Sequence, residues 1–338
     1  MDSRGEKTRK EILEQPEAFR RTIKSIGESV RRAAEALADK FIYASGSGTS
    51  YHASLVFQRS MSKIAGGRVT CIPASELPSW LPEELSGTAL VAYSQSGEST
   101  DIIRAVRSFR EKGGSLVIGI TNVEGSTLDG ISDISVVTKA GREESVAATK
   151  TYTSQLAATL LLSIEIGEFC GKNLSNLRSE LMSVDLKMEE ALRDVFDRAR
   201  RVAEAVKDMN VGFVLGSGAN YPTALEGALK LRETANLYYE GFAAREFLHG
   251  PIQLVSDKTP VVAILPSRFR EVLRKVRSYG APVIRVGFED GNELKIPRIS
   301  EELSPLITVI PLQALAYNLS ILRGLNPDKP EKLSKVVK

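Results

Sequence analysis

The sequence predicts an α/β protein with two parallel β-sheets, each flanked by helices on both faces in a three-layer arrangement. Three observations predict this fold. Short β-rich runs alternate with helical patterns, the strand, loop and helix pattern around Gly46 recurs around Gly216, and 338 residues exceed the size of one ordinary core. Alternation of strands and helices is typical of parallel sheets, because each parallel connection crosses over one face of the sheet.

The first 36 residues are expected to be helical, because apolar side chains such as Ile12 and Phe19 recur at helical spacing among charged residues. The pattern then changes to a β-rich run at residues 41–44, which ends in a loop of glycine and hydroxyl residues before a further helix. Later strands of the same half are predicted at residues 90–93, 116–121 and 134–137.

The second half of the chain repeats the first. Residues 213–221 echo residues 42–51, and Gly216 lies 170 positions after Gly46. A repeat of this length indicates a duplicated domain. The expected organisation is an N-terminal helical segment, a first domain, a helical connector, a second domain and a C-terminal tail, at residues 1–36, 37–171, 172–201, 202–325 and 326–338.

Composition and charge are those of an ordinary globular protein. The 45 basic and 42 acidic residues leave a net charge of +3, too small and scattered for a nucleic-acid-binding stripe. Cys71 and Cys170 are far apart in apolar surroundings, which excludes a disulfide framework and a paired-cysteine metal site. The N-terminus has no apolar signal region, and no apolar run is expected to reach the ~18 residues of a membrane span. We therefore expect a cytoplasmic protein with no nucleic-acid or membrane partner.

Two predicted loops combine small and hydroxyl-bearing residues. The loop Gly46–Ser50 is a weak signal alone, because Tyr51 replaces the third glycine of a dinucleotide fingerprint and no P-loop lysine follows. A tight strand-to-helix turn explains it equally well. The loop Ser94–Ser99 holds three hydroxyls and an amide, and a helix cap explains any one of these serines but not readily all three. Two hydroxyl-rich helix N-termini together predict a phosphate monoester held by neutral donors.

These loops and several later motifs resemble the sugar isomerase (SIS) domains over nearly the whole chain. The resemblance is closest to the isomerase half of glutamine-fructose-6-phosphate aminotransferase, also called glucosamine-6-phosphate synthase, and includes standalone glucosamine-6-phosphate deaminases. It implies two tandem SIS domains. The motifs that carry it are Ser47-Gly48-Thr49-Ser50, Ser94-Gln95-Ser96-Gly97-Glu98-Ser99, Ala140-Gly141-Arg142-Glu143, Val146-Ala147-Ala148-Thr149-Lys150, Glu226-Gly227-Ala228-Leu229-Lys230-Leu231-Arg232-Glu233, His249-Gly250-Pro251 and Leu333-Ser334-Lys335.

The resemblance implies a site for a hexose or aminohexose 6-phosphate. Val146 and Ala148 would lie beside the sugar, with Ala148 in place of a serine that is common in the family. Ser99 stands where threonine is usual, which keeps a hydroxyl donor. The residues implied in holding the phosphate are Ser50, Ser94, Gln95, Ser96 and Ser99.

Four further residues are implied in the chemistry. Glu233 would move a proton between C1 and C2 of the sugar, and Lys230 would assist at the C1 oxygen. His249 would open the sugar ring from the neighbouring subunit, so the resemblance implies a homodimer with shared sites. Lys335 would form a Schiff base with the open-chain ketose, which makes residues 326–338 a catalytic tail. This set needs no cofactor and no metal.

Simpler explanations exist for the same residues. Lysine and glutamate three positions apart, as Lys230 and Glu233 are, commonly form a solvated ion pair. A lone histidine is more often structural, as we expect of His52, and a basic tail is commonly disordered. The separation of 16 positions between Glu233 and His249 matches the family and favours a catalytic role for both residues. The apolar neighbours of Lys335 suit a tail docked on the protein and favour a catalytic role for this lysine.

The resemblance therefore implies an enzyme of amino sugar metabolism that converts glucosamine 6-phosphate to fructose 6-phosphate and ammonia by proton transfer and Schiff-base chemistry. No glutaminase domain is expected, because the chain starts Met1-Asp2 and lacks the nucleophilic cysteine at its start. An ammonia-dependent synthase and a fructosamine-phosphate deglycase would use the same sites. A sugar-phosphate sensor is an alternative of another class, against which the four chemical residues argue together.

Overall fold

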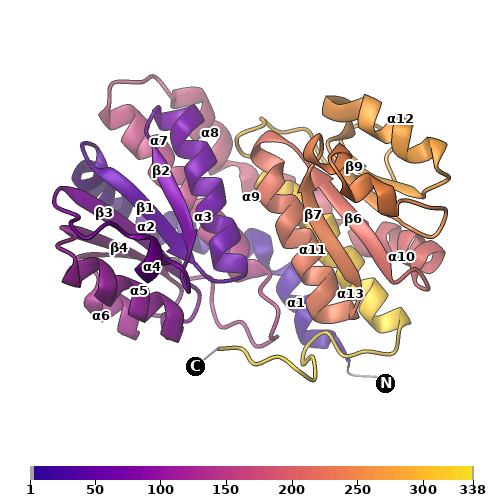
Figure 1. Cartoon of the computed structure of the whole chain (residues 1–338), viewed down its shortest axis with the longest axis horizontal. Coiled ribbons are helices and arrows are strands. Elements are labelled where there is room, and N and C mark those ends of the chain that lie inside the picture. Colours follow the sequence, from indigo (N-terminus) through magenta and orange to yellow (C-terminus); the bar gives the residue numbers. More distant parts are fainter. Residues whose placement is uncertain (1–3, 337–338) are drawn as a thin grey trace. The chain divides into compact units, whose positions relative to one another are not determined.

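The computed structural model describes residues 4–336 and divides into two compact units (Figure 1). The β1–β5 unit contains residues 14–143, 150–185 and 334–336. The β6–β10 unit contains the described residues up to 13, the short segment 144–149, and residues 186–333. Each unit has a five-stranded parallel sheet flanked by helices, which confirms the predicted three-layer α/β fold.

The β1–β5 unit has the strand order β2-β1-β3-β4-β5. Its central strands are apolar runs buried on both faces, as parallel sheets require. Helices α4, α5 and α6 share one apolar core with the sheet, while α7 packs against α2 and α3. The strands are β1 (Phe41–Gly46), β2 (Val69–Pro73), β3 (Thr88–Ser94), β4 (Leu116–Thr121) and β5 (Ile134–Val137).

The helices of this unit differ in how much of their surface is apolar. In α5 the apolar residues form one stripe, so only that stripe is buried, whereas α7 is apolar or small on nearly all sides and is buried along most of its length. The helices are α2 (Gln15–Leu37), α3 (Thr49–Ser60), α4 (Leu77–Trp80), α5 (Thr100–Glu111), α6 (Thr127–Ile131), α7 (Lys150–Phe169) and α8 (Ser175–Met182), with a π-helical turn at Met61–Ala65.

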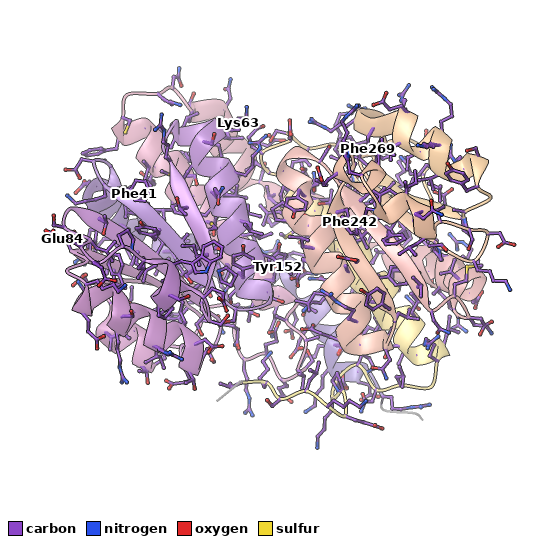
Figure 2. All side chains as sticks on the ribbon, in the orientation of Figure 1. Phe41, Lys63, Glu84, Tyr152, Phe242 and Phe269 are labelled. Carbon is purple, nitrogen blue, oxygen red and sulfur yellow. The ribbon has the colours of Figure 1, made fainter. Side chains whose placement is uncertain are left out.

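The β6–β10 unit has the strand order β10-β9-β8-β6-β7. On one face, α11 packs on β6 and β7 and contacts α13, which also contacts α10. On the other face, α12 closes an apolar core that contains Phe213, Phe247 and Phe269, beside which Phe242 packs (Figure 2). The strands are β6 (Val211–Gly216), β7 (Tyr238–Ala243), β8 (Val261–Ile264), β9 (Val283–Gly287) and β10 (Leu294–Lys295).

The remaining helices belong wholly or mostly to this unit. Short 3₁₀ helices also occur at Gly218–Asn220, Glu246–Leu248, Pro251–Leu254 and Pro266–Phe269. The α-helices are α1 (Glu6–Leu13), α9 (Val184–Leu192), α10 (Val195–Val206), α11 (Tyr221–Ala235), α12 (Arg270–Ser278) and α13 (Pro305–Leu322).

Helix α13 corrects one expectation from the sequence. It is 18 residues long and apolar enough to cross a membrane by length and composition, so the prediction that no apolar run reaches that length is wrong. However, 83% of the helix is buried inside the structure, against α10 and α11. An apolar helix that is covered on all sides is the usual core helix of a large domain.

Candidate active site

Two helix N-termini lie together at the carboxyl edge of the β1–β5 sheet. Strand β1 pairs in parallel with β3, with Ser45 opposite Ala92, so the loops that follow these strands leave the sheet side by side. One loop leads into α3 and the other into α5. The chain winds away from β1 and β3 in opposite directions, and such a switch point is where α/β sheets bind ligands. The first N–H groups of both helices have no partner within the helix and attract anions.

The hydroxyls of the loop after β3 stabilise its turn. The Ser94 hydroxyl accepts a 3.1 Å hydrogen bond from the N–H of Gly97, and the Ser96 hydroxyl accepts one of 3.1 Å from the N–H of Glu98. Gly97 has φ of +69°, and a Cβ there would lie 2.0 Å from the Ser126 hydroxyl, so only glycine fits. The turn therefore has one conformation that directs the chain into α5.

Ser50 is the second residue of α3, and Ser99 directly precedes α5. Ser50 is buried, and its hydroxyl accepts a 3.1 Å hydrogen bond from the Gln155 amide. Ser99 is the N-cap residue of α5 in an extended conformation, and its side chain makes no capping hydrogen bond. The Ser99 hydroxyl thus remains available to a ligand at the helix N-terminus.

A cavity of about 710 Å³ opens beside the loop after β3. Gln95 and Ser96 line it from the loop, Lys335 lines it from the C-terminal tail, and Arg21, Lys139 and Arg142 add positive charge. The β1–β5 unit therefore brings together three of the predicted site residues around one cavity. Volumes of this size hold small organic ligands.

The tail residue Lys335 is held by a buried carboxylate. Its Nζ atom lies 2.8 Å from Oε2 of Glu143, whose side chain is 0% exposed. Glu143 also accepts hydrogen bonds from the N–H of Thr151 at 3.2 Å and from its hydroxyl at 2.6 Å. A buried carboxylate is costly without a cation, so this pair opposes the disorder that is usual for a basic tail.

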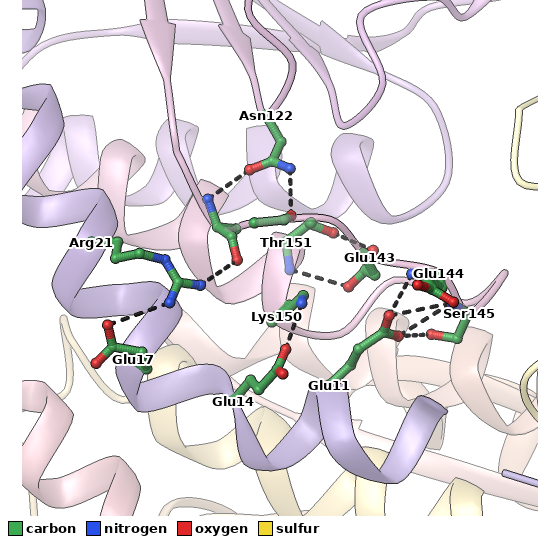
Figure 3. Close-up of polar contacts among 12 residues, drawn as sticks. Glu11, Glu14, Glu17, Arg21, Asn122, Glu143, Glu144, Ser145, Lys150 and Thr151 are labelled. Atoms are coloured by element: carbon green, nitrogen blue, oxygen red, sulfur yellow. Dashed lines mark hydrogen bonds and ion pairs between the residues drawn. The ribbon is translucent and has the colours of Figure 1, made fainter. Parts of the chain in front are cut away.

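The segment before Glu143 is held by polar contacts from two neighbouring elements (Figure 3). Arg21 of α2 donates to the Ala140 carbonyl at 2.7 Å. Asn122, which follows β4, accepts from the N–H of Ala140 at 2.7 Å and donates to the Gly141 carbonyl at 3.0 Å. These contacts fix the backbone that presents Glu143 to Lys335.

In the β6–β10 unit, α11 buries a lysine between two glutamates. The Nζ atom of Lys230 lies 2.6 Å from Oε2 of Glu233 and 3.2 Å from Oε1 of Glu226. The exposed fractions of these side chains are 2% for Lys230, 0% for Glu226 and 22% for Glu233, which excludes a solvated ion pair. The one partly exposed carboxylate is the predicted base.

The two glutamates determine the protonation of Lys230. Burial by itself lowers the pKa of a lysine, but the charges of Glu226 and Glu233 outweigh burial, and the pKa of Lys230 is raised above its ordinary value. Lys230 is therefore a protonated hydrogen-bond donor at neutral pH. Glu226 remains bonded to this cation inside the core and helps to orient it.

The other predicted residues of this unit lie on separate segments. His249 is exposed and follows the 3₁₀ helix Glu246–Leu248, where its N–H donates to the Glu246 carbonyl at 2.9 Å. Val146 and Ala148 are half-buried in the segment 144–149. His52, expected to be structural, is buried on α3 of the other unit. Within residues 4–336, no group of three or more His, Cys, Asp or Glu side chains could hold a metal ion.

Three glutamates near the predicted residues received no individual role in the sequence interpretation, although Glu143 and Glu226 belong to the motifs that carry the family resemblance. Glu226 lies four positions before Lys230, and this helical spacing was the available signal. Glu143 has no local signal, because its partner Lys335 is 192 positions away. Glu11 of α1 binds Ser145, accepting from its N–H at 3.3 Å, and so anchors the segment that carries Val146.

Nearly the whole chain is similar to known proteins of one kind. A family model described as SIS domain matches residues 38–164 and 210–323. The glutamine–fructose-6-phosphate aminotransferases [isomerizing] of Thermococcus kodakarensis and Pyrococcus horikoshii are 40% and 37% identical over 349 and 342 residues. Each alignment covers 97% of this chain and 57% of the relative. The chain thus spans a little over half the length of these relatives.

Two solved structures are similar over nearly their full length. The C-terminal domain of glucosamine-fructose-6-phosphate aminotransferase from Francisella tularensis has a TM-score of 0.88 and 30% identity, covering 94% of this chain and 96% of that one. Glucosamine-6-phosphate deaminase from Thermotoga maritima has a TM-score of 0.80 and 25% identity, covering 98% and 99%.

Proposed function

The chain belongs to the SIS-domain family of sugar-phosphate isomerases, and on this basis we propose that it converts glucosamine 6-phosphate to fructose 6-phosphate and ammonia. The observation that carries the proposal is the buried cluster on α11. A protein that only binds sugar phosphates has no need for Lys230 buried between Glu226 and Glu233, which is costly to desolvate. A proton-transfer enzyme needs such a cluster, because it combines a fixed cation with a carboxylate base.

In this proposal the phosphate is bound by neutral donors. The ligands are the side chains of Ser50, Ser94, Gln95, Ser96 and Ser99, together with N–H groups at the starts of α3 and α5. The free N-cap hydroxyl of Ser99 and the pairing of β1 with β3 support this assignment. Helix N-termini supply positive potential without a lysine, so the phosphate dianion is bound while lysines stay available for chemistry.

The proton transfers are assigned to three residues. His249, supplied by a neighbouring copy of the chain, moves the proton of the C1 hydroxyl to the ring oxygen and so opens the sugar to the aldehyde. Glu233 then removes the proton from C2 and returns it to C1, and a proton of the amino group passes to the C1 oxygen, so the 2-amino aldehyde becomes a C2 imine with a C1 hydroxyl. Negative charge develops on the C1 oxygen in between. The raised pKa of Lys230 keeps it protonated, so it stabilises this charge by donating a hydrogen bond.

The nitrogen leaves by exchange at C2. The neutral amine of Lys335 adds to the C2 imine, ammonia departs, and water then hydrolyses the lysine imine to release fructose 6-phosphate and the free amine. Lys335 has to lose a proton before it attacks. The Glu143 carboxylate lies 2.8 Å from Nζ and is assigned as the acceptor of that proton. Val146 and Ala148 are assigned to the wall beside the sugar.

A second candidate is favoured by the names of the relatives. The two aminotransferases named above align with 97% of this chain. The same residues run in reverse would form glucosamine 6-phosphate from fructose 6-phosphate, with ammonia supplied from elsewhere. Measuring both directions of the reaction tests the proposal. One assay gives the initial rate of ammonia release from glucosamine 6-phosphate, and the other gives the initial rate of glucosamine 6-phosphate formation from fructose 6-phosphate and ammonium. A faster release supports the deaminase, and a faster formation supports the synthase.

The same assay also tests whether the protein is a sugar-phosphate sensor. Tight binding of glucosamine 6-phosphate with no turnover in either direction would contradict an enzymatic role. Release of an amino acid from a fructosamine 6-phosphate, at a rate above that of ammonia from glucosamine 6-phosphate, would identify a deglycase instead.

A further inference from the structure

A second cavity, of about 450 Å³, lies in the β6–β10 unit between α12 and the chain around β9. None of the predicted catalytic or phosphate-binding residues lines it. Four arginines do: Arg270, Arg274 and Arg277 from α12, and Arg285 from β9. This concentration of guanidinium groups around one hollow has no part in the proposed reaction.

Helix α12 forms one side of the cavity through its exposed face. Arg270, Arg274 and Arg277 follow one another at spacings of four and three, so they share one stripe of the helix. The opposite stripe, with Val272 and Val276, is buried in the core and fixes the rotation of the helix. Such a charged stripe is usually a solvated surface. Here the stripe borders a hollow, which provides room for a ligand.

The positive charge of this cavity is only partly neutralised by the chain itself. Arg285 is bound by Glu293, with contacts of 2.7 and 3.0 Å. Arg270 lies 3.9 Å from Glu289, and both side chains are largely exposed, so this contact contributes little. Arg274 and Arg277 contact no acidic side chain among residues 4–336. Two guanidinium groups are thus available at the cavity, and a third is weakly held.

The lining indicates the chemistry of the ligand. Guanidinium groups bind phosphate and carboxylate oxygens through paired N–H donors. The Ser267 hydroxyl and the buried Asn292 amide add neutral polar groups. No aromatic side chain is among the described residues that line this cavity, so it offers no surface for stacking a base. We propose that the arginine-lined cavity binds a small polyanion with two or more phosphoryl groups.

The size and shape of the site favour a small molecule over a macromolecule. Nucleic-acid surfaces are extended basic stripes, whereas these arginines surround a hollow of ligand size. A neighbouring cavity of about 240 Å³ shares Ser267 and Asn292 and extends to Phe288 and Arg298. The organic part of a phosphorylated ligand has room there. This site would bind its ligand independently of the proposed reaction, and binding can be measured without substrate.

Calorimetric titration of the full chain with inorganic pyrophosphate, at constant ionic strength and without sugar phosphate, tests the proposal. Saturable binding of pyrophosphate is expected, tighter than that of orthophosphate. Replacing two arginines, as Arg274→Gln with Arg277→Gln, should weaken pyrophosphate binding at least tenfold, since each change removes charge-assisted hydrogen bonds to the phosphoryl oxygens. A nucleoside diphosphate and a hexose bisphosphate, titrated separately, distinguish adjacent from separated phosphoryl groups.

The matched control replaces two exposed arginines at the same spacing on another helix, Arg104→Gln with Arg107→Gln on α5. This control variant should bind pyrophosphate as the parent does. If pyrophosphate binding weakened equally in both double variants, the loss would come from the lower net charge of the protein. That result would contradict a specific site at α12. Pyrophosphate binding no tighter than orthophosphate would also overturn it. A poly-glutamate peptide or single-stranded DNA that binds this face more tightly than every small polyphosphate would overturn the assignment to a small ligand.

Discussion

The side chains of Glu143 and Lys335, 192 positions apart in the sequence, form an ion pair of 2.8 Å. Glu143 is fully buried and already bonded to the N–H and hydroxyl of Thr151. The pair therefore joins the end of the chain to a rigid point at the start of α7. Lys335 lines the nearby cavity, and its position there is set by the buried Glu143 carboxylate as well as by the tail.

We expect Glu143→Gln to impair the Schiff-base step selectively. The amide keeps the size of the side chain but removes both the charge that holds Lys335 and the proposed proton acceptor. Turnover should fall about tenfold or more, since a hydrogen bond to a charged group contributes about 1.5–3 kcal/mol. Borohydride trapping of fructose 6-phosphate on Lys335 should fall with it, while the Michaelis constant stays nearly constant.

Glu144→Gln is the matched control for this change, because Glu144 is adjacent, exposed and also paired with a lysine. It should retain parental trapping. The tail provides a second readout: trypsin should cleave at Lys335 faster in Glu143→Gln than in Glu144→Gln. Unchanged trapping together with unchanged cleavage in Glu143→Gln would show that the pair does not position Lys335.

Ser96→Ala should raise the Michaelis constant for glucosamine 6-phosphate and leave the turnover number nearly unchanged. The phosphate does not react, so its contacts are equal in the ground and transition states. Steady-state kinetics over a range of sugar-phosphate concentrations measures both constants. Ser79→Ala, at an exposed position of α4, is the control. A fall in turnover with no change in the Michaelis constant would contradict the assignment of Ser96 to the phosphate.

Lys230→Met should destabilise the fold by about 3–5 kcal/mol, because it removes the ammonium group that lies 3.2 Å from the buried Glu226 carboxylate. Urea unfolding at neutral pH measures this loss. The pKa of Lys230 is raised above its ordinary 10.5, so its contribution is complete below pH 10.5 and declines as pH rises through the folded value. The difference from the parent should therefore be constant through the neutral range. A variant as stable as the parent would mean that Glu226 is protonated or solvated.

Mixed dimers test the assignment of His249 to a neighbouring copy of the chain. Glu233→Gln and His249→Ala should each be nearly inactive alone. If the site is shared, hybrids formed after subunit exchange contain one site with both native residues, and part of the activity returns. Native mass spectrometry of the mixture verifies that hybrids form. Verified hybrids without activity would remove the shared-site proposal.

Local patterns were enough to predict the parallel sheets and the hydroxyl loops. The spacing of apolar residues and the presence of turn residues are properties of short segments. The loop after β3 is likewise held by contacts within it, such as the hydrogen bond from the N–H of Gly97 to the Ser94 hydroxyl. The partners of the chemical residues were harder to predict. Glu143 meets Lys335 only because the tail returns to the first sheet, and no local pattern encodes that return. The burial of Lys230 depends on how α11 packs on α13, which its spacing from Glu233 does not reveal.

The membrane-span expectation failed for a related reason. Helix α13 is largely apolar because most of its residues are buried against other elements of its own unit, chiefly α10 and α11. Sequence alone cannot distinguish a helix enclosed by protein from one enclosed by lipid, since both lack a polar stripe. The structure resolves the ambiguity by burying 83% of the helix.

The most direct test of the proposed reaction is to incubate the protein with glucosamine 6-phosphate in deuterium oxide and to measure ammonia, fructose 6-phosphate and deuterium at C1 together. Equal amounts of ammonia and fructose 6-phosphate are predicted, with deuterium at C1 wherever the proton on Glu233 exchanges with solvent. Glu233→Gln should slow both products by about 10²–10⁴, the usual contribution of a general base. Ammonia release at the parental rate in Glu233→Gln, or ammonia without fructose 6-phosphate, would contradict isomerising deamination at this site.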